Sequence, residues 1–279
     1  MKKSSRINLI RIAAVAVLGM FSLATSSVAA TKRPLNYPFG LTVDAKGNLY
    51  VANTNGNEVL VYNANHMQVP TKRISNNVSA PTAVAFDGSG NLWVANDGSQ
   101  VSITQYSPAG VQNTNATLTQ GLIGPSALAV DGLNDLWVID DFNNLIWFAA
   151  NQSTPTPVGG GQTITGVAAH QAYLAIGSNT LTYVAEISLL FYNTPQISQF
   201  PGNSFALAYD NTGNLYSANQ DDTLTVMDPA GNTRLVSNLG FFPTGLALDN
   251  TRGLIYVANG LGNEIAVFST GGTLVTTIK

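Results

Sequence analysis

Apolar and polar residues alternate along most of this 279-residue chain in short runs that recur at a regular interval. Each repeat begins with a small–large alternation such as residues 83–86 (Ala-Val-Ala-Phe), and a turn rich in Gly and Asn follows. A Leu-aromatic-Val-Ala run comes next, as at residues 92–95, then a third apolar run such as residues 101–106. A more polar run ends the unit, as at residues 234–236 and 273–275. Period-two alternation with many β-branched and aromatic residues predicts four strands per repeat.

The repeat occurs six times, and the spacing of one position near the end of the first strand gives the length of the repeat. That position is occupied by Asp44, Asp87, Asp131, His170, Asp210 and Asp249. Four strands in about forty residues is typical of a propeller blade. The prediction is therefore an all-β fold over residues 31–279, a six-bladed β-propeller of four-stranded antiparallel blades. We expect the ring to close by side-chain packing between the first and last blades, with a short pairing by residues 32–35 as an addition.

The repeat resembles a known family. Residues 38–44 (Pro-Phe-Gly-Leu-Thr-Val-Asp), followed by residues 47–53 (Gly-Asn-Leu-Tyr-Val-Ala-Asn), look like the NHL repeat, and residues 242–249 match it equally well. The resemblance covers residues 36–279. Residues 49–53 and 255–259 also resemble surface-layer YVTN-type repeats, and residues 91–94 resemble streptogramin-lyase repeats. Six units favour the NHL assignment over these seven-bladed relatives. The resemblance implies a propeller and no particular activity.

The first thirty residues have the composition of a secretory signal peptide. Four basic residues precede an apolar stretch over residues 12–23, and Val28-Ala29-Ala30 supplies the small residues of a cleavage site. A membrane span needs about twenty apolar residues, and Ser22 and Thr25 interrupt this stretch too early. We therefore expect cleavage after residue 30, an exported protein that is periplasmic or secreted, and no membrane span after cleavage.

Loss of the signal makes the chain more acidic. The whole chain has 12 basic and 15 acidic residues, and removing the four basic residues of the signal leaves 8 against 15, a net charge of −7. The remaining basic residues are scattered, with only Lys32-Arg33 and Lys72-Arg73 adjacent. A basic footprint that could neutralise phosphates is missing, which argues against nucleic acid as a partner. Cys is absent, so stability must come from packing without disulfides.

The repeated Asp residues predict turns more strongly than a ring of acids. An Asp followed shortly by Gly and Asn is turn chemistry, because the carboxylate accepts backbone N–H groups and Gly supplies the positive φ. The loops after the second strands are better binding candidates, since loops on a rigid scaffold commonly carry function. We expect these loops to gather on one face around the central channel. The candidate residues there are Asn53, Asn96, Asp140, Asp141, Asn219, Asp221 and Asn259.

Catalytic and metal-binding groups are sparse. His66 and His170 are the only histidines and belong to distant turns, and no nucleophile elbow is present. The streptogramin-lyase resemblance implies a His-and-acid metal site near the channel, and the sequence shows no equivalent. No catalytic residue, metal site or cofactor is therefore predicted. The adjacent pairs Asp140-Asp141 and Asp221-Asp222 leave open a divalent cation such as calcium.

The fourth repeat departs from the others. Its first turn is short, and the apolar residues near position 192 suggest that the third strand ends late. This reading places an inserted loop at residues 179–187. Leu181 and Tyr183 make that segment unusually apolar, so we expect a flap or contact patch beside the channel mouth.

These observations favour an exported, non-catalytic binding module that uses the loop face around the channel. Its partner would be an envelope protein, a peptide or a glycan. The alternative is a metal-dependent hydrolase or lyase of the lactonase or streptogramin-lyase propeller type.

Overall fold

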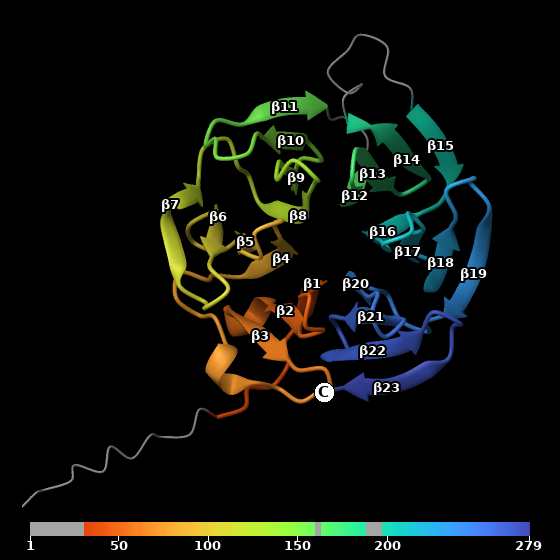
Figure 1. Ribbon diagram of the computed structural model, residues 1–279, viewed down its shortest axis with the longest axis horizontal. Coiled ribbons are helices and arrows are strands. Elements are labelled where there is room, and N and C mark those ends of the chain that lie inside the picture. Colours follow the sequence, from red (N-terminus) through yellow and green to blue (C-terminus); the bar gives the residue numbers. More distant parts are fainter. Residues whose placement is uncertain (1–30, 160–162, 188–196) are drawn as a thin grey trace, which may run out of the picture. The chain divides into compact units, whose positions relative to one another are not determined.

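The computed structural model describes residues 31–159, 163–187 and 197–279. The expected signal peptide, residues 1–30, lies outside them. Within the described residues, the strands form six antiparallel sheets around a central axis (Figure 1). The six-bladed propeller is confirmed. None of the helices in this part of the chain is long and apolar enough to span a membrane.

The strands of each blade follow one another in sequence order from the axis outward. The first three blades contain β1 (Pro38–Val43), β2 (Leu49–Asn53), β3 (Glu58–Tyr62); β4 (Pro81–Phe86), β5 (Leu92–Asn96), β6 (Ser102–Tyr106), β7 (Gln112–Leu118); β8 (Pro125–Val130), β9 (Leu136–Asp140), β10 (Leu145–Phe148), β11 (Thr156–Gly159). The last three contain β12 (Ile164–His170), β13 (Tyr173–Ser178), β14 (Leu181–Glu186), β15 (Ile197–Pro201); β16 (Ser204–Tyr209), β17 (Leu215–Asn219), β18 (Thr223–Met227), β19 (Thr233–Asn238); β20 (Gly245–Asp249), β21 (Leu254–Asn259), β22 (Glu264–Ser269), β23 (Leu274–Ile278).

Blade one has an irregular outer edge. Its sheet has three strands, and the fourth position is taken by a segment that bridges Tyr62 to Gln68 and Val59 to Ile74. Between these bridges lies the short 3-10 helix η2 (Pro70–Lys72). Proline lacks a backbone N–H and cannot complete a strand ladder, which accounts for the interruption.

The core is divided into six apolar clusters, one at each junction between neighbouring blades. The cluster that joins blade one to blade six contains 12 buried residues, including Leu60 and Tyr256. The cluster between blades four and five contains 4 in the described part of the chain. Blades pack face to face, so both faces of each inner strand are buried. The ring is therefore closed by side-chain packing, as predicted. Residues 31–35 form no strand, and Leu35 is buried in the closure cluster.

Asp residues at the ends of the first strands form hydrogen-bonded turns, which confirms the turn interpretation. In blade one, Oδ1 of Asp44 accepts the backbone N–H groups of Lys46 (2.9 Å) and Asn48 (2.8 Å). The side-chain amide of Asn48 donates to Oδ2 (2.7 Å), and Gly47 takes the positive φ of 75°. The same Oδ1 acceptance of backbone N–H groups occurs at Asp87, Asp131, Asp210 and Asp249, and also at Asp140 and Asp228.

Acid should weaken the fold partly through Asp210. Burial alone raises the pKa of this carboxyl, but hydrogen bonds from Asn214 and Thr212 outweigh that effect and lower its pKa. Its stabilisation is thus present above the unfolded-state pKa of about 3.9 and is lost as the pH falls through the lower folded value. Asp210→Asn keeps the turn but should lose less stability between about pH 4 and pH 2 than the parent protein does. Urea denaturation across this range measures the difference.

Asp221→Asn removes an exposed carboxylate outside these turns and is the control for Asp210→Asn. If the two variants show the same pH dependence, the turn carboxylate is not the source of the acid sensitivity.

The inserted loop predicted at residues 179–187 of blade four is wrong. Leu181 and Tyr183 belong to β14, the third strand, which pairs with β13 and β15. The apolar run near position 192 had suggested a later strand, but the alternation over Leu181–Glu186 forms the ladder. Because β14 ends at Glu186, the distance from the aromatic Tyr173 agrees with the other blades. The extra length falls in the connection from β14 to β15, where residues 188–196 lie outside the described residues.

A hydroxyl-lined cleft as the candidate functional site

The central channel is too narrow to be the main binding cavity. The first strands of all six blades enclose a space of only about 80 Å³. Channel-facing threonines bond across blade junctions: Thr244 Oγ1 donates to the carbonyl of Pro38 (2.8 Å), and Thr165 Oγ1 donates to that of Ser204. Phe39 and Phe205 also lie close together, with ring centroids 5.9 Å apart. These contacts narrow the axis, and larger cavities lie between blades.

Five of the sequence-predicted residues end the second strand of a blade and are buried. Asn53 and Asn96 are each 1% exposed. Oδ1 of Asn53 accepts the N–H of Asn36 (2.6 Å), and Oδ1 of Asn96 accepts that of Ser79 (3.1 Å). In the same way Asn259 accepts the N–H of Gly262, and Asp140 accepts that of Phe142. These four side chains hold loops of their own blades, and only Asn219, the fifth, lies in the wall of a large cavity.

The remaining predicted loop residues are exposed but separate. Asp141 lies on blade three, where partial burial, followed by the charges of Asp97 and Asp140, raises its pKa. Asp221 lies on blade five and accepts a hydrogen bond from Thr223 (2.6 Å). The structure therefore brings Asn219 and Asp221 to one cleft, places Leu181 and Tyr183 on β14 of the neighbouring blade, and leaves the other predicted residues on blades one, two, three and six.

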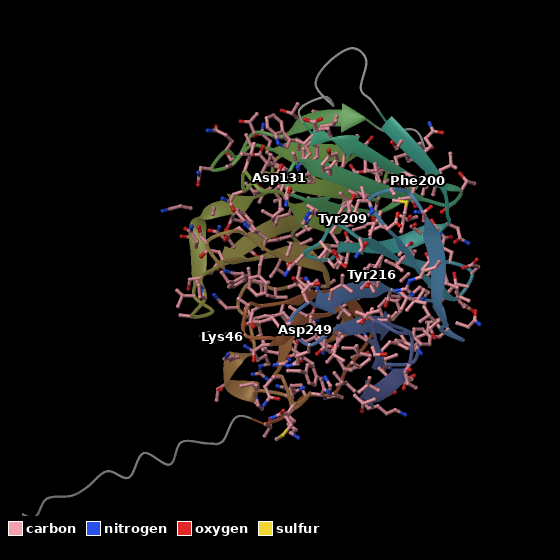
Figure 2. The ribbon with its side chains drawn as sticks, turned by 45° about the vertical axis from the view of Figure 1, so that its right-hand side comes forward. Lys46, Asp131, Phe200, Tyr209, Tyr216 and Asp249 are labelled. Carbon is pink, nitrogen blue, oxygen red and sulfur yellow. The ribbon has the colours of Figure 1, made fainter. Side chains whose placement is uncertain are left out.

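A cleft of about 380 Å³ opens between blades four and five. Its walls come from β14 and β15 on one side and from β16, β17 and β18 on the other; Figure 1 shows these strands facing one another. Asn179 and Asp221 line it from the loops at one end of these strands, and Phe200 and Met227 line it from β15 and β18. Figure 2 labels Phe200 on the outer strand β15.

Hydroxyl groups replace apolar side chains in this cleft. The second-strand position held by Val51, Val94, Val138 and Val257 in other blades is Ser217 in blade five. Ser217 Oγ lies 2.6 Å from Ser204 Oγ, which in turn lies 2.7 Å from Thr182 Oγ1. Serine is smaller than valine and polar, so the blade junction loses apolar filling at this point.

Asn219 extends the hydroxyl network toward the loop that carries Asp221. Its Nδ2 donates to Thr223 Oγ1 (2.9 Å) and Thr225 Oγ1 (3.1 Å), while its Oδ1 accepts a bond from Ser217 (2.5 Å). Throughout the described residues, every buried side-chain nitrogen or oxygen has a hydrogen-bond partner. A satisfied network of this kind is rigid. Each hydroxyl offers one donor and two acceptor sites, so the hydroxyls of this network can bond to a ligand as well as to one another.

An aromatic groove of about 420 Å³ lies at the opposite end of the same blade junction. Phe200 and Met227 line both this groove and the cleft. His170 packs against Tyr209 with ring centroids 5.5 Å apart. Burial, with a smaller effect of Tyr173, raises the pKa of Tyr209 to about 12, so its phenol stays neutral in ordinary buffers.

The hydroxyl residues of the cleft were missed by sequence reasoning. Ser217 was the available signal, because it interrupts the Leu-aromatic-Val-Ala pattern. Thr182 lay within the segment assigned to an inserted loop. Among the residues that the structure describes, no group of three His, Cys, Asp or Glu side chains is arranged to hold a metal ion.

Comparison with solved structures supports the fold alone. A structure of streptogramin B lyase superposes with a TM-score of 0.62 at 13% identity, covering 90% of this chain and 85% of that one. Virginiamycin B lyase from Staphylococcus aureus gives 0.59 at 12% identity, covering 87% and 84%. Kuenenia stuttgartiensis hydrazine synthase gives 0.61 at 15% identity, covering 83% of each. No family model matches the chain, and no curated protein matches its sequence.

Proposed function

We propose that this chain is an exported binding module that holds a neutral, hydroxyl-rich ligand, a glycan, in the cleft between blades four and five. The observation that carries the proposal is the hydrogen-bonded network of Ser204, Ser217, Asn219 and Thr225, in which Ser217 stands where other blades have a valine. Sugar hydroxyls need donors and acceptors together, and Ser, Thr and Asn side chains supply both. Phe200 and Met227 offer an apolar wall for the C–H face of a sugar ring.

A glycan fits the cleft better than the other partner classes, an envelope protein or a peptide. Among the described residues that line the cleft, Asp221, in the loop between β17 and β18, is the only charged side chain. A network that is already rigid also loses little entropy when a ligand binds. The proposal assigns no cofactor to the site.

Two related proposals concern the repeat and the location. The six repeats, five of which contain the Asp turn, support an NHL-type propeller. The basic and apolar segments of residues 1–30 support export, and N-terminal sequencing of the purified protein checks for cleavage after Ala30.

Titration calorimetry of the mature protein with neutral oligosaccharides tests the binding function. Short α-glucan, β-glucan, mannan and chitin fragments are suitable probes, and saturable binding of at least one class is expected. Failure of all of them, with binding of an envelope peptide at the same cleft, would replace the glycan by a peptide. A stoichiometric divalent metal in the purified protein, with turnover of a substrate, would support the hydrolase or lyase alternative.

Thr225→Val should weaken glycan binding about tenfold, a loss of about 1.4 kcal/mol. The substitution keeps the shape of the side chain but removes a cleft hydroxyl. Thr104→Val is the matched control, because Thr104 has the same strand position in blade two and accepts a hydrogen bond from Asn96 (3.2 Å). Calorimetric titration compares the two variants, and equal weakening by both would place the binding site outside the cleft.

A further inference from the structure

The basic residues of the expected mature chain gather on one side of the ring. Residues 74–233 contain 11 acidic residues and no Lys or Arg. Five of the basic residues belong to blade one or the segment before it, two to blade six and one to β19. These residues are Lys32, Arg33, Lys46, Lys72, Arg73, Arg234, Arg252 and Lys279. Although the net charge is negative, the seam between blades one and six is thus the positive part of the propeller.

A cleft of about 540 Å³ lies on this seam. Three cationic side chains line it, from Lys32, Arg33 and Lys279, and no acidic residue is among the described residues of its wall. The rest of the lining is largely polar and includes Gln68 and Thr276. Figure 1 shows the C-terminal end of the chain between β3 and β23, and Lys279 at that end lines the cleft.

The segment that carries Lys32 and Arg33 is fastened to blade one. The backbone N–H of Arg33 donates to Oε1 of Gln68 (2.7 Å), and Nε2 of Gln68 donates to the carbonyl of Arg33 (2.7 Å). Leu35 is buried in the closure cluster two residues later. The two cations are therefore held at the cleft by the fold.

Lys32 and Arg33 also lack acidic partners in the described part of the chain. The salt bridges there join Arg73 to Glu58, Arg252 to Asp249, and Lys279 to Glu264. The last pair is 3.5 Å apart with the lysine side chain 77% exposed, and exposed pairs of this kind are weak. Lys279 can therefore leave Glu264 for a stronger anion.

We propose that this seam cleft binds a small polyanion that carries phosphate groups. The arginine fork suits phosphate oxygens, and two lysines add compact positive charges beside it. A volume of about 540 Å³ accommodates more than one phosphate group. The acidic remainder of the chain repels such ligands, so binding concentrates at the seam and falls as salt rises. This site is separate from the glycan cleft and does not depend on it.

Titration calorimetry with tripolyphosphate at low and moderate salt tests the proposal. Lys32→Gln combined with Arg33→Gln should weaken binding at least about tenfold. Lys46→Gln combined with Lys72→Gln removes the same charge from blade one outside the cleft and should change binding less than about twofold. Thermal melts confirm that both double variants are folded. Equal weakening in the two double variants, or no saturable binding by the parent protein, would overturn the site.

Sedimentation with lipid vesicles distinguishes a phosphate headgroup from a soluble ligand. Vesicles of phosphatidylglycerol mixed with phosphatidylcholine are compared with phosphatidylcholine alone. Retention on the anionic vesicles that requires Lys32 and Arg33 assigns the phosphate to a headgroup. Binding of tripolyphosphate without vesicle retention assigns it to a soluble molecule. If neither probe depends on these two residues, the proposal is wrong.

Discussion

Replacement of Trp137 by alanine should lower the free energy of unfolding by about 3–5 kcal/mol. The Trp137 side chain is fully buried at the junction of blades three and four. Its indole N–H donates to Oδ2 of Asp131 (2.9 Å), and its ring lies 6.4 Å from that of Trp147. The substitution therefore opens a large cavity and removes one donor from a buried carboxylate. Urea denaturation followed by circular dichroism measures the loss.

Trp93→Ala is the matched control for Trp137→Ala. Trp93 occupies the same strand position in blade two and donates to Asp87 (3.3 Å), but its ring is partly exposed. Less apolar surface is lost there, so a cost of about 1–3 kcal/mol is expected. If Trp93→Ala costs as much as Trp137→Ala, burial at the blade junction does not set the size of the effect.

Leu60→Ala should destabilise the ring by about 3–5 kcal/mol. Leu60 is 1% exposed within the cluster that closes blade one on blade six. Blades one and six are the first and last in the sequence, so no loop connects them directly. Packing and a few hydrogen bonds, such as Thr244 to Pro38, therefore hold the two blades together. Its neighbours come from two rigid sheets that cannot collapse around a missing side chain, which keeps the cavity cost high.

Leu207→Ala removes the same atoms from the junction of blades four and five. Leu207 is 8% exposed, and its cluster is the smallest among the described residues. The hydroxyl-lined cleft nearby allows water to approach the vacated space, so a loss of about 2–3 kcal/mol is expected. Denaturation of both variants under the same conditions compares the two junctions. A larger loss for Leu207→Ala than for Leu60→Ala would contradict the expectation that the closure cluster contributes more to stability.

Much of the fold is predictable because the information is local. The alternation that forms β5 and the Asp turn that precedes it lie within a few residues of each other, and four further repeats carry the same two signals. Blade four shows the limit of such reasoning. There Leu181–Glu186 and the apolar run near position 192 both fit a strand, and the pairing of β14 with β13 decides between them.

The candidate site is less predictable for a related reason. Asn53 and Asn96 have the composition of binding loops, yet their side chains turn inward and bond to their own blades. Composition alone does not distinguish an amide that holds a loop from one that faces a ligand. Ser217 was visible as an irregularity, but its meaning depends on Thr182 and Ser204, which complete the network.

The sequence by itself determined the six repeats, the strand order within each blade and the turns at the repeated Asp residues, whereas closure of the ring by packing was an expectation that the structure decided. These features follow from patterns within about forty residues and from the need of each blade to bury both faces. Only the tertiary structure decided that the axis is narrow and that the larger cavities lie between blades. Thr182 and Ser217, which line one cavity, are 35 positions apart in the sequence. Lys32 and Lys279, which line another, lie near opposite ends of the chain. Side chains from different blades meet only when the ring has formed, so no local pattern encodes the cavities that they share.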